Sequence, residues 1–134
     1  MNTLTEYRFY ATYNSGWFKT SIAYVGIDRE AIEAKRAEIE AESKTNEDIT
    51  NIGDITENTS RGLLWQDWTS NTAGNDFIQG KAIKVGECHT DSRCTGQKSF
   101  YTLPEYAEEA KKEMDSKRKG QERAADAYYS QQWV

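Results

Sequence analysis

The first segment of the chain alternates between apolar and polar residues with a period of two. Its apolar positions are Tyr7, Phe9, Ala11 and Tyr13. That period is typical of a strand with one buried face. Asn14-Ser15-Gly16 follows and is rich in residues that tolerate a tight turn. A second apolar-rich run extends to Val25, with Phe18, Ile22 and Tyr24 on one side. We expect a β-hairpin over residues 5–25.

Two aromatic rings fall on the polar side of this hairpin. Tyr10 and Trp17 lie outside the alternating apolar set, so we expect both rings to be exposed. They form a candidate contact patch for a partner. A platform that stacks on nucleic acid bases carries interleaved basic residues, and here only Arg8 and Lys19 are nearby.

Residues 28–43 read as a helix. Asp28 can cap the free N–H groups of the first turn, and Ile27 and Ile32 have the spacing of a hydrophobic staple. The segment is rich in Ala, Glu and Lys, which favour helices. Ile32 and Ile39 are its large apolar residues. With so few anchors, much of the acidic surface of this helix should remain in water.

Residues 44–76 predict a loop that contains an aromatic plug. The stretch 44–62 is polar, and we expect at most one short strand in it. Leu63, Trp65 and Trp68 are the apolar residues expected to enter the core. Tryptophans beside Asn and Asp could instead bind a sugar or a planar ligand, and that alternative stays open.

A second hairpin is expected over residues 77–103, with strands at 77–85 and 97–103. Its loop carries the possible metal ligands Cys88, His89, Asp91 and Cys94. A structural zinc site needs four ligands, usually in two separated pairs. The loop stands alone, so we predict no metal site and no cofactor, and dispensable thiols that can form an optional disulfide.

The C-terminal segment predicts a helix over residues 103–131. Thr102 and Glu105 have capping-box spacing, and Pro104 suits the first turn. Leu103, Tyr106, Ala107, Ala110 and Met114 form an apolar stripe. Gly120 weakens a helix by roughly 1 kcal/mol relative to Ala, so we expect a break there.

These elements predict one domain over residues 1–134 with an α+β fold. Strands cluster in two hairpins, and helices are attached to them. The prediction is one antiparallel sheet of about four or five strands, packed on one face by the acidic helix and the long C-terminal helix.

Charge is distributed unevenly along this domain. The chain of 134 residues has a net charge of −5. Residues 28–57 hold ten acids and four bases, a net of −6, so the flanks together are near neutral. A local acidic block repels nucleic acid and attracts basic surfaces. The alternative is a solvated helix face with no partner.

The sequence contains no recognisable catalytic motif. His89 is the only histidine, and there is no Gly-rich phosphate loop or dinucleotide fingerprint. We therefore expect a protein that is not an enzyme. The N-terminus lacks the pattern of a signal peptide, and no run approaches the roughly 20 apolar residues of a membrane helix. The expected location is cytoplasmic, without membrane contact.

The stretch FYATYNSGWF followed by an acidic helix resembles the opening of the ArdA antirestriction proteins. Those proteins begin with a strand, a Tyr-Asn-x-Gly turn and acidic elements. They mimic DNA and are carried by plasmids and phages. The likeness is confined to the first hairpin and the helix after it. It implies an inhibitor carried by a mobile element.

The leading hypothesis is a small acidic protein-binding module, an inhibitor of a host defence enzyme that handles nucleic acid. The candidate partner-binding residues are Glu30, Glu33, Glu38, Glu40, Glu42, Tyr10 and Trp17. One alternative is a nucleic-acid-binding module that uses Arg8, Lys19, Lys111, Lys112, Lys117 and Arg118. A small enzyme with an unrecognised site is the other.

Overall fold

The computed structural model describes residues 3–60, 62–67, 74–89 and 97–132, with backbone only at residues 67, 88–89, 97–98 and 121–132. Within these residues the fold is α+β. The strands are β1 (Thr5–Ser15), β2 (Phe18–Gly26), β3 (Ile49–Ile52), β4 (Thr56–Thr59), β5 (Trp65–Asp67), β6 (Asn75–Phe77), β7 (Ile83–His89) and β8 (Gln97–Thr102). The helices are α1 (Arg29–Ser43), the 3-10 turn η2 (Pro104–Tyr106) and α2 (Ala107–Gln132).

The first hairpin is present as β1 and β2, paired from Tyr7 opposite Gly26 to Ser15 opposite Phe18. Gly16 takes a φ of 64° in the turn between them, a conformation that glycine adopts without strain. The inner side carries Phe9, whose ring stacks on that of Tyr24 at 4.9 Å. Phe18 was expected on this inner side but is 72% exposed. It lies next to the turn, and its side chain is not among those packed against the core.

β1 and β2 belong to a five-stranded mixed sheet. The order is β3-β1-β2-β6, and β4 also pairs with β1. Helix α1 packs against this sheet, and its Ile32 and Ile39 join Phe9 and Tyr24 in one buried cluster. Segment 44–62, expected to hold at most one short strand, holds both β3 and β4. These two strands form by pairing with β1. Their own sequences are too short and too polar to show the alternation that predicts a strand.

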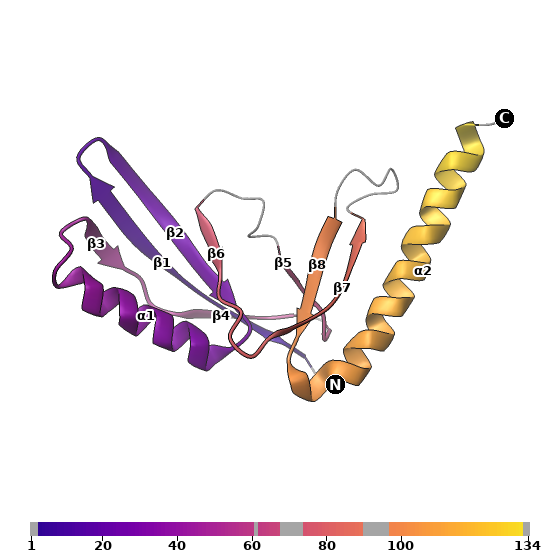
Figure 1. Cartoon of the computed structure of the whole chain (residues 1–134), viewed down its shortest axis with the longest axis horizontal. Coiled ribbons are helices and arrows are strands. Elements are labelled where there is room, and N and C mark those ends of the chain that lie inside the picture. Colours follow the sequence, from indigo (N-terminus) through magenta and orange to yellow (C-terminus); the bar gives the residue numbers. More distant parts are fainter. Residues whose placement is uncertain (1–2, 61, 68–73, 90–96, 133–134) are drawn as a thin grey trace.

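The strands do not form the single antiparallel sheet that the sequence predicts. β5, β8 and β7 form a separate three-stranded antiparallel sheet. The strand expected over 77–85 is split, because β6 ends at Phe77 and β7 begins at Ile83. β6 runs parallel to β2 in the first sheet. The two sheets stand side by side with α1 and α2 at opposite ends of the molecule (Figure 1).

A second buried cluster joins the two sheets. The ring of Trp65, from β5, stacks on Phe77, from β6, with centroids 4.9 Å apart. Tyr101, from β8, meets Phe77 at 4.7 Å. Leu4, Val25, Ile27 and Ala82 complete the buried part of this cluster. We call these residues the aromatic seam. Trp65 thus enters the core as predicted, although from a strand, and it offers no free face for a planar ligand.

Asp28 holds the connection between the sheets and does not cap α1. Its side chain makes no capping hydrogen bond. Instead, Asp28 Oδ2 accepts a hydrogen bond from the Lys81 backbone N–H at 2.8 Å. Gly80 lies beside it with a φ of 53°, and an added Cβ there would meet Asp28 Oδ2. Ile27 and Ile32, expected as a staple, lie in different buried clusters.

Helix α2 packs against the second sheet. Ala110 and Met114 are buried, and an added Cβ on Gly86 of β7 would come within 2.9 Å of Met114 Cγ. The helix continues without a break from Ala107 to Gln132, so the break expected at Gly120 is absent. Neighbouring residues with strong helix propensity carry the helix through one glycine. No described helix has the length and apolar character needed to cross a membrane.

The hydroxyl of Tyr24 makes the stability of the larger sheet sensitive to alkaline pH. Burial, followed by the 2.7 Å hydrogen bond to the Tyr13 hydroxyl, raises the pKa of Tyr24 above its ordinary value of 10.0. A raised pKa means that the folded state favours the neutral phenol. Its contribution to stability is therefore full below about pH 10 and is lost as the pH rises further.

We predict that Tyr24→Phe reduces the loss of stability between about pH 8 and about pH 11. Urea unfolding at each pH provides the measurement. Phe18→Leu, in an exposed ring of the same hairpin that carries no hydroxyl, is the control and should retain the wild-type profile. An unchanged profile in Tyr24→Phe would show that this phenol does not titrate with unfolding.

Candidate protein-binding surface

Nine exposed carboxylates cover α1, β4 and the connections on either side of β3. They are Glu30, Glu33, Glu38, Glu40, Glu42, Glu47, Asp48, Asp54 and Glu57. We call this surface the acidic face. The cations in the same stretch are Arg29, Lys35, Arg36 and Lys44. Nine acids against four bases leave a net charge of −5 on the acidic face. The tenth acid of the block, Asp28, is buried.

Two arginines tie the acidic face together across elements. Arg29 pairs with Glu33 at 2.9 Å and with Glu57 of β4 at 3.7 Å. Arg36 pairs with Glu40 at 3.0 Å, and its Nε donates to the Gly53 carbonyl at 2.9 Å. These exposed pairs each contribute little to stability. They connect α1 to β4 and to the residue that follows β3.

The two flanks of α1 face different strands. On one flank, Lys35 pairs with Glu38 and lies 5.8 Å from the Tyr24 ring of β2. Glu42 acts on the same tyrosine, where its charge adds to the rise in the Tyr24 pKa. On the other flank, Glu40 and Ala37 line a groove beside β3. The acidic face therefore has a β2 side and a β3 side.

The groove beside β3 has a volume of about 560 Å³. Its lining residues are Ala37, Glu40, Ala41, Ser43, Lys44, Ile49, Thr50, Asn51 and Ile52. Every residue of β3 contributes to it. Sequence reasoning missed this groove, because it depends on a strand that was not predicted. Ile49 and Ile52 are three residues apart, which is not the period of a strand, so the sequence carries no clear signal of the groove.

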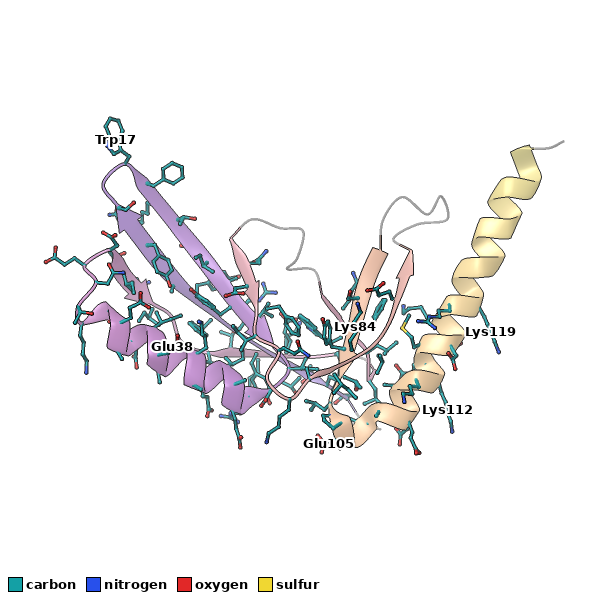
Figure 2. All side chains as sticks on the ribbon, in the orientation of Figure 1. Trp17, Glu38, Lys84, Glu105, Lys112 and Lys119 are labelled. Atoms are coloured by element: carbon teal, nitrogen blue, oxygen red, sulfur yellow. The ribbon has the colours of Figure 1, made fainter. Side chains whose placement is uncertain are left out.

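The candidate partner-binding residues fall on two surfaces. Glu30, Glu33, Glu38, Glu40 and Glu42 are all exposed on α1, as the sequence predicted. Tyr10 is 48% exposed, and Trp17 is fully exposed. Figure 2 shows Trp17 projecting from the tip of the hairpin, while Glu38 lies on α1.

The hairpin tip carries a second exposed ring that was not among the candidates. Phe18 is 72% exposed, next to Trp17. We call Trp17 and Phe18 the aromatic tip. Tyr10 lies further along β1, where its hydroxyl accepts a hydrogen bond from Arg8. The acidic face reaches this end of the hairpin at Asp48, whose carbonyl accepts a hydrogen bond from the Asn14 N–H at 2.7 Å.

The basic residues of the nucleic-acid alternative are dispersed. Arg8 is held by Glu6 at 2.8 Å in the first sheet. Lys117, on α2, lies 5.2 Å from the Phe100 ring, and Arg118 Nε donates to the Glu87 carbonyl. α2 and the first sheet lie at opposite sides of the molecule (Figure 1). These cations do not form one patch.

The metal and disulfide predictions stay predictions. The backbone of Cys88 and His89 forms the end of β7, but Asp91 and Cys94 lie outside the described residues, as does Trp68. Among the residues that are described, no three His, Cys, Asp or Glu side chains gather to hold a metal ion.

Comparison with protein-family models, with curated proteins and with solved structures found no match.

We predict that two tryptophan substitutions change the stability of the protein by very different amounts. Trp65→Ala, in the aromatic seam, should cost about 3–5 kcal/mol of stability because it leaves a cavity between the sheets. Trp17→Ala should change stability by less than about 0.5 kcal/mol, because its side chain makes no buried contact. Urea unfolding compares the two variants. Equal losses would contradict the separation between a structural ring and a surface ring.

Proposed function

We propose that this protein is a binding module that engages a basic surface of a partner protein through its acidic face. The observation that carries the proposal is the surplus of exposed carboxylates over cations on α1 and the β3–β4 edge. Local ion pairs involve many of these acids, yet they leave the net charge of the face unchanged. Such a surface attracts positively charged partners over a distance of about 10 Å at moderate salt.

The aromatic tip supports a second contact within the same complex. Trp17 and Phe18 are large apolar side chains exposed to solvent. Aromatic residues are enriched in the cores of protein interfaces, and tryptophan is enriched among the residues whose truncation costs most binding energy. In this proposal the acidic face provides orientation and association rate, and the aromatic tip provides apolar burial.

The proposed partner is an enzyme that handles nucleic acid. Such enzymes bind phosphates through clustered Lys and Arg, and the acidic face would compete for those cations. The protein would then act as an inhibitor, encoded by a phage or plasmid and directed at host defence in the cytoplasm. The resemblance of the first hairpin and helix to ArdA proteins supports this choice. Dispersed cations make the nucleic-acid-binding alternative less favourable.

We predict that immobilised protein captures a basic, nucleic-acid-handling partner from a host-cell lysate and releases it at moderate salt. Triple charge reversal of Glu33, Glu38 and Glu40 to Lys should weaken binding by about tenfold or more, if each charge contributes roughly 0.5 kcal/mol. Mass spectrometry identifies the partner, and titration of the purified partner measures the affinity. Added duplex DNA should displace the partner.

The matched control reverses three acids at the other end of the molecule. Glu105, Glu108 and Asp115 are exposed on η2 and α2, and their change to Lys alters the net charge by the same amount. This control variant should retain the partner. Equal losses in both variants would mean that only the overall charge matters, and unchanged binding in both would contradict a role for the acidic face.

A further inference from the structure

β3 is an edge strand with an unpaired side. It pairs with β1, and the described residues place no strand on its other side. The Gly53 N–H donates to the Tyr10 carbonyl of β1 at 2.8 Å. Backbone groups of successive residues in a strand point to opposite sides. The N–H and carbonyl of Ile52, one residue earlier, therefore point away from β1.

The groove lies between this edge of β3 and helix α1, which forms its other side. Ala37 and Ala41 of α1 line it opposite β3. Their side chains are small, so they leave room for the side chains of another strand. Arg36 of α1 binds the Gly53 carbonyl at 2.9 Å, directly after the last residue of β3. The edge of β3 is thus open at Ile52 and tied to α1 beyond it, while at its start the Ile49 N–H donates to the Asn46 carbonyl at 3.3 Å.

The charged residues around this edge of β3 determine which kind of segment can bind there. Glu47 and Asp48 precede β3, and Asp54 follows it, so acids flank the strand at both ends. Glu40 adds a fourth acid in the groove, against the cations Lys44 and Arg36. A second copy of this chain would bring the same acids to the edge and be repelled. A strand with basic side chains would be attracted.

We propose that an extended, basic segment of the partner adds to the edge of β3 as a new strand in the groove beside α1. This inference rests on the proposed function and locates its contact. Main-chain hydrogen bonds to Ile52 would supply affinity, as in other cases of strand addition. Alternate side chains of the segment would face α1, and basic residues at its ends would meet Glu47 and Asp54.

A synthetic peptide tests the mode of binding. The probe is fluorescein-labelled Lys-Val-Lys-Val-Lys-Val-amide, measured by anisotropy with the full chain. Two control peptides carry N-methyl groups on either the valine or the lysine nitrogens and keep the same charge. Only one of these sets of N–H groups can face β3. One methylated peptide should therefore bind at least about tenfold more weakly than the parent peptide. The other should bind with the same affinity as the parent peptide.

Three variants of the chain locate the binding site. Ala41→Trp fills the groove and should abolish peptide binding, with circular dichroism used to verify folding. Glu47→Lys with Asp54→Lys removes the acids that flank β3 and should weaken binding. Glu105→Lys with Glu108→Lys makes the same change in charge on η2 and α2, outside the acidic face, and should leave binding unchanged.

The outcomes separate this inference from the proposed function. Equal binding of both methylated peptides would overturn strand addition, and so would undiminished binding of the parent peptide to Ala41→Trp. Either result would mean that the peptide is held by charge attraction alone. Absence of peptide binding would also overturn strand addition. Capture of a basic partner that depends on Glu33, Glu38 and Glu40 but tolerates Ala41→Trp would keep the proposed function and refute this inference. A dimer that Ala41→Trp abolishes would assign the edge to a second copy.

Discussion

The contact between Trp65 and Phe77 links the two halves of this structure. Trp65 comes from β5 in the smaller sheet, and Phe77 comes from β6 in the larger one. Their stacking, with Tyr101 against Phe77, buries apolar surface that neither sheet could bury alone. Within the larger sheet, the Ile78 N–H donates to the Val25 carbonyl at 2.9 Å and continues the pairing that holds β6, and with it Phe77, beside β2. The position of each sheet relative to the other depends on this seam.

The seam also determines what remains exposed. Trp65 and Val25 join the two sheets directly, so no described helix packs between them. Helix α1 covers the larger sheet, and helix α2 covers the smaller one. α1 needs only Ile32 and Ile39 as buried anchors. The remainder of its surface carries charged residues and the small alanines that line the groove. The same arrangement leaves β3 as an edge strand beside α1, so that an unpaired backbone and a surplus of carboxylates occur together. The proposed binding surface is a consequence of this division of the core.

The sequence predicted elements that are specified locally. Alternation over residues 7–13 and the turn at Gly16 identified the first hairpin, and composition identified α1 with its five exposed glutamates. Elements specified by distant partners were missed. β4 reads Thr-Glu-Asn-Thr, has no alternation and exists through pairing with β1. The split at Phe77 depends on Gly80 and its contact with Asp28, which is distant in sequence. The groove was missed for the same reason, because one of its walls is β3.

The central claim is that β3 presents an open backbone edge beside the acidic helix. Native-state amide hydrogen exchange of the free protein tests it at two adjacent residues. The Gly53 amide, bonded to Tyr10, should exchange slowly, at a rate set by opening of the larger sheet. The Ile52 amide, directed into the groove, should exchange without such protection. Equal, strong protection of both amides would show that the edge is already covered and would contradict the account.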